Sequence, residues 1–188
     1  MKLGDIKDNL MPMLDDAHWA ENALDADDNQ FTRRAYIRSL FALIEGSIWV
    51  LKQTVLLAPV KQGNVKRLTA AEYALLSDKT FDLKSNGQPK EQTKFLKLPE
   101  NIRFTFSVVE KYFGMKIDLE VGKEPWNKFL EAQQVRNRIT HPKTPSDFVV
   151  SDSEITACKD ACSWFNELVA TFFNGLVRSK AGGAEGNA

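Results

Sequence analysis

Cysteine and histidine are scarce in this sequence, which has two of each among its 188 residues. Two cysteines cannot build a disulfide scaffold or a four-cysteine zinc site, and two histidines cannot form a multi-histidine metal site within one chain. We therefore expect no metal and no other cofactor. Because Cys158 and Cys162 fall within one helical pattern, we interpret them as small core residues.

An excess of charge is also lacking, because 25 basic residues balance 25 acidic residues. A chain dedicated to nucleic acid or to a membrane surface usually shows such an excess, so any partner of this kind must contact a local patch. The first residues include acidic side chains where a signal peptide has an apolar run, and no stretch reaches the roughly 18 to 20 apolar residues of a membrane span. We expect a cytoplasmic protein without a membrane partner.

Several motifs of common enzymes are missing as well. The sequence contains no glycine-rich phosphate loop, no G-x-S-x-G nucleophile turn and no H-E-x-x-H zinc helix. Apolar residues make up 43% of the chain, which is enough for one hydrophobic core, and the length fits a single main domain.

Apolar residues that recur at intervals of three and four predict helices, and Pro, Gly or capping sequences mark their ends. The four main helices are predicted at residues 30–58, 99–114, 125–141 and 151–180. Between the first two, residues 69–98 form an insertion with a short helix and a small hairpin or ordered loop, whose flanking segments are Phe81–Lys84 and Lys94–Leu98. This order of elements predicts an all-α fold, an antiparallel helical bundle.

The charge distribution divides the chain further. Residues 1–29 hold two lysines and eight acidic residues, a net charge of −6, so the remainder carries +6. We predict an acidic N-terminal arm over residues 1–29 with a short helix around Leu14–Leu24, lying either near the more basic body or in solvent. The helical domain then covers residues 30–180, and residues 181–188 form a disordered tail.

The densest polar chemistry lies at the end of the third main helix, in the segment Arg-Asn-Arg-Ile-Thr-His at 136–141. Arg136 continues the series of apolar residues, three and four positions apart, that face the core from this helix. Because burying an unpaired guanidinium is costly, Arg136 must pair with a carboxylate or face a cleft or an interface. His141 lies where Pro142 breaks the helix, so its side chain can turn toward Arg136 and share one anion with it. A fixed cation beside an imidazole is the minimum for metal-free RNA cleavage, although a helix cap has the same composition.

The segment Arg136-Asn137-x-x-x-His141, followed by Pro, resembles the signature of the HEPN superfamily of all-α proteins. The resemblance implies that Arg136 and His141 are the catalytic pair, that Asn137 is their polar companion, and that Glu45 holds the arginine. It also implies a metal-independent endoribonuclease that acts as a homodimer, in a toxin or defence system with a neutralising protein partner. The alternative is a catalytically silent module of this fold that binds a nucleotide, RNA or a protein.

Six basic residues form a candidate RNA-binding patch, because RNA binding draws mainly on contacts to phosphates. They are Arg33, Arg34, Arg38, Lys128, Arg138 and Lys143. An ordinary solvated surface has the same composition, and this alternative stays open. Trp126, near the start of the motif helix, is interpreted either as a core residue or as a platform for a stacked base.

Overall fold

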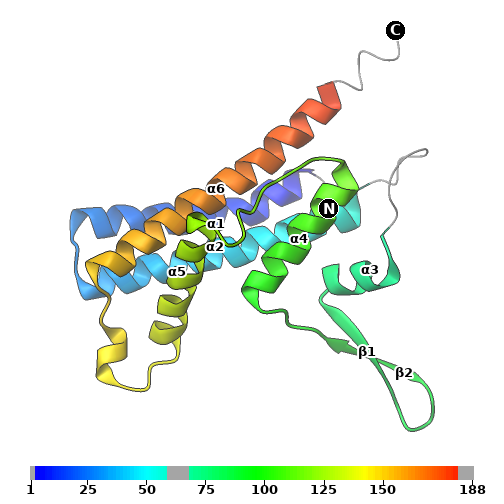
Figure 1. Ribbon diagram of the computed structural model, residues 1–188, viewed down its shortest axis with the longest axis horizontal. Coiled ribbons are helices and arrows are strands. Elements are labelled where there is room, and N and C mark those ends of the chain that lie inside the picture. The colour runs from blue at the N-terminus through cyan, green and yellow to red at the C-terminus, as the bar shows by residue number, and fades with distance from the viewer. Residues whose placement is uncertain (1–2, 59–67, 182–188) are drawn as a thin grey trace. The chain divides into compact units, whose positions relative to one another are not determined.

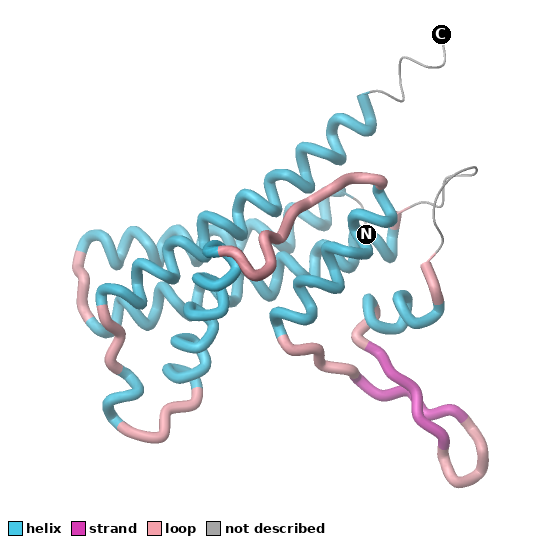
Figure 2. Tube along the Cα trace, in the orientation of Figure 1, coloured by secondary structure: helices cyan, strands magenta, loops and turns pink. Residues whose placement is uncertain are grey.

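The computed structural model describes the backbone of residues 3–58 and 68–181 and the side chains of residues 8–58 and 68–176. The described residues are mostly helical, which confirms the predicted all-α class, and they include one two-stranded hairpin (Figure 1, Figure 2). In chain order the elements are α1 (Leu3–Ala26), α2 (Gln30–Leu57), α3 (Ala70–Leu76), β1 (Lys79–Leu83), β2 (Pro89–Thr93), α4 (Leu98–Phe113), α5 (Glu124–Thr140), the 3-10 helix η1 (Pro145–Phe148) and α6 (Asp152–Ala181). The predicted tail lies outside the described residues, apart from Ala181 at the end of α6.

The chain divides into two compact units. The first consists of Met1–Ile6 and Ile48–Lys116, and the second of Lys7–Ser47 and Ile117–Ala188. This division differs from the predicted arm, helical domain and tail, because α4 belongs to the first unit with the insertion, whereas most of α1 belongs to the second. The candidate motif lies entirely in the second unit, at the end of α5.

The insertion contains a small hairpin, one of the two forms expected for it, but its second strand is not the expected one. The strands β1 and β2 are antiparallel, with Lys79 opposite Thr93 and Leu83 opposite Pro89. Gly87 adopts a positive φ of 77°, which glycine tolerates without strain, so the chain turns tightly there. The second strand begins to pair with the first at Pro89, two residues after Gly87. The second strand therefore occupies the polar residues 89–93, whereas Lys94–Leu98 lead into α4.

Polar contacts fasten the short helix α3 within the first unit. Thr69 caps α3 and forms a reciprocal capping box with Glu72. The same carboxylate accepts hydrogen bonds from the Lys111 ammonium group of α4 at 2.7 Å, and this cation holds the pKa of Glu72 below its usual value. Helix α4 then ends at Gly114, whose left-handed backbone is the expected helix stop.

Aromatic side chains form the core of the second unit. The ring centroid of Phe129 on α5 lies 6.3 Å from that of Phe41 on α2 and 5.3 Å from that of Trp164 on α6. The ring centroid of Trp126 lies 5.7 Å from that of Trp164, and Trp126 is only 5% exposed. The interpretation of Trp126 as a platform for a base is therefore wrong, because its ring is buried in this core. Further buried apolar residues continue the core along α2 and α5: Ile37, Leu40, Ile44, Ala132, Val135 and Ile139.

Helix α1 is much longer than the short helix predicted around Leu14–Leu24, since it spans Leu3–Ala26. Its C-terminal half buries Ala20 and Leu24, and an ion pair joins Asp25 to Lys159 of α6 at 2.9 Å. A Cβ atom built on Gly46 of α2 would lie only 2.0 Å from the Met13 sulfur, so a larger residue at this approach of α1 and α2 would require the Met13 side chain to move. The acidic segment is thus a packed helix in its second half.

Among the described residues, α2 is the one helix that is long and apolar enough to cross a membrane. The expectation that no stretch qualifies overlooked it, because only Glu45 and Lys52 interrupt the apolar run in its later part. In the protein, 56% of that apolar window is buried, which is typical of a core helix. Cys158 is also buried and Cys162 is half-buried, in agreement with their interpretation as core residues.

Candidate functional site

Local sequence explains how the motif comes to lie at the end of a helix. Pro125 stands in the first turn of α5, where its missing N–H group costs nothing. At the other end the backbone N–H of His141 donates to the Asn137 carbonyl at 3.0 Å, and the helix then stops before Pro142. The motif therefore occupies the last helical turn and the C-cap of α5.

Three contacts orient the Arg136 guanidinium. Its Nη2 atom forms an ion pair with the Glu45 carboxylate of α2, and its Nη1 atom donates to the Asn137 side-chain oxygen at 3.1 Å. The centre of the guanidinium also lies 5.9 Å from the ring centroid of Phe41, one turn before Glu45 on α2. The Arg136 side chain is 28% exposed and that of Glu45 is 45% exposed, so solvent reaches the pair.

His141 and Asn137 are both exposed at the same helix end. Within the described part of the chain, the His141 imidazole makes no hydrogen bond and no ion pair. The structure thus brings together Arg136, Asn137 and Glu45, and it leaves the His141 side chain at the edge of this cluster.

Two arginines of the predicted RNA-binding patch are tied into the fold. Arg33 forms ion pairs with Asp28 and Asp152, and its Nη1 atom donates to the Val150 carbonyl at 2.9 Å. Its cation holds the pKa of Asp28 below its usual value. Arg138, within the motif, donates to Glu154 at 2.6 Å and to two carbonyls of the connection between α5 and α6.

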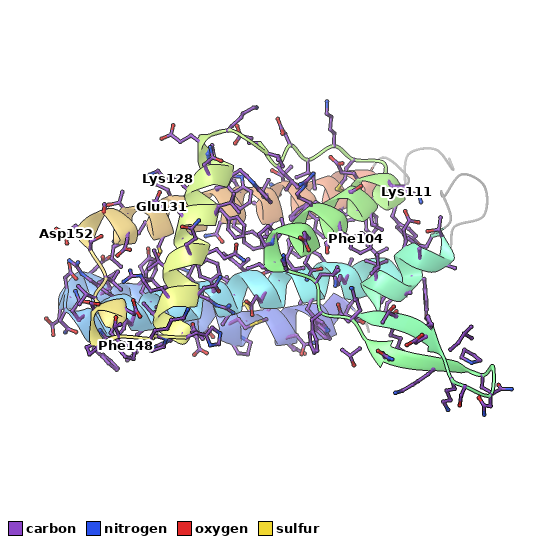
Figure 3. All side chains as sticks on the ribbon, turned by 60° about the horizontal axis from the view of Figure 1, so that its bottom comes forward. Phe104, Lys111, Lys128, Glu131, Phe148 and Asp152 are labelled. Atoms are coloured by element: carbon purple, nitrogen blue, oxygen red, sulfur yellow. The ribbon has the colours of Figure 1, made fainter. Side chains whose placement is uncertain are left out.

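The other four patch residues have fewer charged partners. Arg34 donates to the Phe148 carbonyl and lies over its ring, and Arg38 donates to the Ile139 carbonyl of α5. Lys128 pairs with Glu131 one turn later at 3.2 Å, whereas no ion pair of the Lys143 ammonium group occurs among the described residues. In Figure 3, Lys128 and Glu131 lie on α5, and Phe148 and Asp152 lie at the far end of the connection. RNA binding by this patch stays a prediction.

The connection between α5 and α6 is held by residues that the sequence analysis did not single out. The Asp147 carboxylate accepts hydrogen bonds from the backbone N–H groups of Lys143 and Thr144 at 2.7 and 2.8 Å, and these donors hold the pKa of Asp147 below its usual value. Gln30 of α2 forms two hydrogen bonds with the Val150 backbone. The spacing Thr144-x-x-Asp147 is the one sequence signal that could have revealed this arrangement. His141 therefore precedes an ordered segment.

Comparison with protein-family models, with curated proteins and with solved structures finds no match. Among the described residues there is also no group of three or more His, Cys, Asp and Glu side chains arranged to hold a metal ion. The candidate site accordingly rests on its own geometry, a carboxylate-held guanidinium with a neighbouring amide and an exposed imidazole at a helix end.

Proposed function

We propose that this chain is a HEPN-like, metal-independent endoribonuclease. The observation that carries the proposal is the Arg136 guanidinium, held by Glu45 and Asn137 where α5 ends and where the exposed His141 follows. A guanidinium that is already oriented can stabilise a charged phosphorane without further reorganisation. An exposed imidazole is the side chain best suited to proton transfer near neutral pH.

The reaction requires one base and one acid. The base takes the proton of a ribose 2′-hydroxyl, whose oxygen bonds to the adjacent phosphorus, and the acid gives a proton to the departing 5′-oxygen. The product strand then ends in a 2′,3′-cyclic phosphate. One chain supplies a single histidine at this helix end, so we propose a symmetric homodimer in which two copies of His141 and Arg136 face one RNA strand. Sedimentation should show this dimer at micromolar concentration.

The same proposal includes the antiparallel four-helix bundle of the HEPN superfamily and a cytoplasmic role as a toxin or defence effector with a neutralising protein partner. Its structural support lies in the second unit, where α5 reverses through a short connection into α6. Phe129 of α5 contacts Phe41 of α2, and Asp152 of α6 pairs with Arg33 of α2. A helical hairpin of this kind is the repeating element of such bundles.

A second candidate function is a catalytically silent module that binds a nucleotide, RNA or a protein. It is favoured by the contacts of the arginines, since Glu45 already neutralises Arg136, and Arg33 and Arg138 fasten the connection between α5 and α6. In this function the motif arginines are structural, and their replacement lowers stability without any loss of catalysis.

Cleavage of varied single-stranded RNAs in the presence of a chelator distinguishes the two functions. Arg136→Ala and His141→Ala should each lower the rate by roughly 10²- to 10⁴-fold, the usual loss for a charge-stabilising or acid–base group. Arg103→Ala and His18→Ala replace exposed residues of the same types on α4 and α1 and should leave the rate unchanged. An inactive wild-type protein would favour the silent module, and full activity of both motif variants would place the chemistry elsewhere.

A further inference from the structure

The hairpin of the first unit exposes large apolar side chains that no described residue covers. Phe81 and Leu83 of β1 are 59% and 73% exposed, and Phe95, two residues after the end of β2, is 88% exposed. In Figure 2 the two strands extend away from α3 and α4. Single exposed apolar residues are ordinary, but a group of them on one small element indicates an interaction surface.

The pairing register places two of these side chains together. Phe81 and Leu83 are two residues apart on β1, so they lie on the same face of the hairpin. Their cross-strand neighbours are Glu91 and Pro89, and Glu91 forms an ion pair with Lys79 across the strands. The surface thus presents an aromatic ring and an aliphatic side chain side by side, and Phe95 follows two residues beyond the end of β2.

The same element carries an excess of uncompensated positive charge. Asp78 pairs with Lys52 and Glu91 pairs with Lys79, whereas the third acidic residue, Asp82, stands opposite Lys90 without an ion pair to any residue that the structure describes, so the five lysines of residues 79–97 still outnumber the acidic residues. Four exposed lysines have no ion pair among the described residues, and they are Lys84, Lys90, Lys94 and Lys97. An anionic partner therefore complements the hairpin better than a neutral or basic one.

The base of the hairpin is firmly anchored. Lys52 of α2 is only 1% exposed, and its ammonium group donates to Asp78 at 2.6 Å and to the Leu75 carbonyl at 3.3 Å. A buried ammonium group needs such partners, so this contact fixes Asp78, which enters β1 with a positive φ of 53°. The Asp78 carbonyl also accepts the Lys94 N–H at 2.8 Å. The exposed strands are therefore presented from a fixed base.

We propose that the hairpin binds single-stranded RNA, with Phe81 and Phe95 stacking on bases and with the four unpaired lysines contacting phosphates. Exposed aromatic rings interleaved with basic residues are the combination by which proteins bind single strands without strict sequence preference. Leu83 widens the apolar surface beside Phe81. The choice of RNA as the nucleic acid rests on the proposed function, whereas the location of the binding surface rests on the hairpin alone.

Fluorescence anisotropy of a short labelled oligouridine with fully 2′-O-methylated riboses tests this proposal with the full-length chain. This probe lacks the nucleophilic hydroxyl, so binding is measured without cleavage. Phe81→Ala and Phe95→Ala should each weaken binding by roughly 5- to 150-fold, the loss for one stacked base. Phe81→Trp should retain the affinity, and Trp19→Ala, which removes an exposed ring of α1, should not change it.

Replacing the four unpaired lysines with Gln should make binding less dependent on salt, lowering the slope of log affinity against log salt by up to about 3. Circular dichroism verifies that the variants, all of exposed residues, remain folded. Unchanged affinity in the hairpin variants, or no binding by the wild-type protein, overturns the proposal. Unchanged affinity with an altered sedimentation coefficient assigns the surface to protein association instead. Wild-type binding without cleavage of ordinary RNA would contradict the ribonuclease function and leave the hairpin proposal standing.

Discussion

Glu45→Gln removes the charge that faces Arg136 while it keeps the length of the side chain. Because the two side chains are 28% and 45% exposed, solvent screens the pair, and its contribution to stability should be about 0.2 to 1 kcal/mol. In a chain of this size, a loss of about 1 kcal/mol lowers the melting temperature by roughly 2 to 4 °C. Glu167→Gln, an exposed residue of α6, is the matched control and should cause no such shift.

The effect of the same substitution on cleavage should be larger than its effect on stability. The guanidinium keeps its charge but loses one of its orienting contacts, and misplacement of a catalytic group costs up to about 10²-fold in rate. If Glu45 acts only through Arg136, then Glu45→Gln should add almost nothing to Arg136→Ala, in both melting temperature and single-turnover rate. Fully additive losses would refute the reasoning, since they would mean that Glu45 acts independently of Arg136.

Three further predictions concern the surroundings of the motif. Arg138→Ala should lower the free energy of unfolding by about 1 to 3 kcal/mol in urea titrations, because a charged donor to Glu154 is lost. Burial raises the pKa of Cys158 to about 12, so its thiol should react with disulfide reagents at pH 8 only after unfolding. The pKa of Asp147 is lowered in the folded state, so its stabilising contribution is present above about pH 4 and is lost as the pH falls further. The protection factor of the Thr144 amide, which is the unstructured exchange rate divided by the observed rate at the same pH, should fall there, and protection that persists at lower pH would contradict this.

Helix ends were predictable because local residues determine them. Pro99 and Gly114 mark the two ends of α4, and Pro125 and Pro142 mark those of α5, each acting within one turn. The length of α1 was not predictable in this way, because contacts such as that of Met13 with Gly46 of α2 join residues far apart in the sequence. The second strand was misplaced because residues 89–93 are polar, and pairing with β1 rather than apolar spacing defines them.

The candidate site likewise combines features that the local sequence determines with features that depend on residues far away in the sequence. The position of Arg136 and His141 at the end of a helix follows from the local sequence and Pro142. The partner of Arg136 was named only through the family resemblance, and the roles of Arg33 and Arg138 were missed, because their carboxylate partners lie on other elements. A count of basic residues cannot distinguish a cation that is available to RNA from one that holds a loop.

The chemistry of the cleaved ends tests the central claim most directly. Mass spectrometry of one defined oligonucleotide, cleaved by the wild-type chain in a chelator, should reveal a 2′,3′-cyclic phosphate or its opened form on one product and a 5′-hydroxyl on the other. A single 2′-deoxy substitution at the cleaved position should abolish the cut. A 3′-hydroxyl with a 5′-phosphate, or cleavage at the deoxy position, would contradict attack by the 2′-hydroxyl and with it the function assigned to Arg136 and His141.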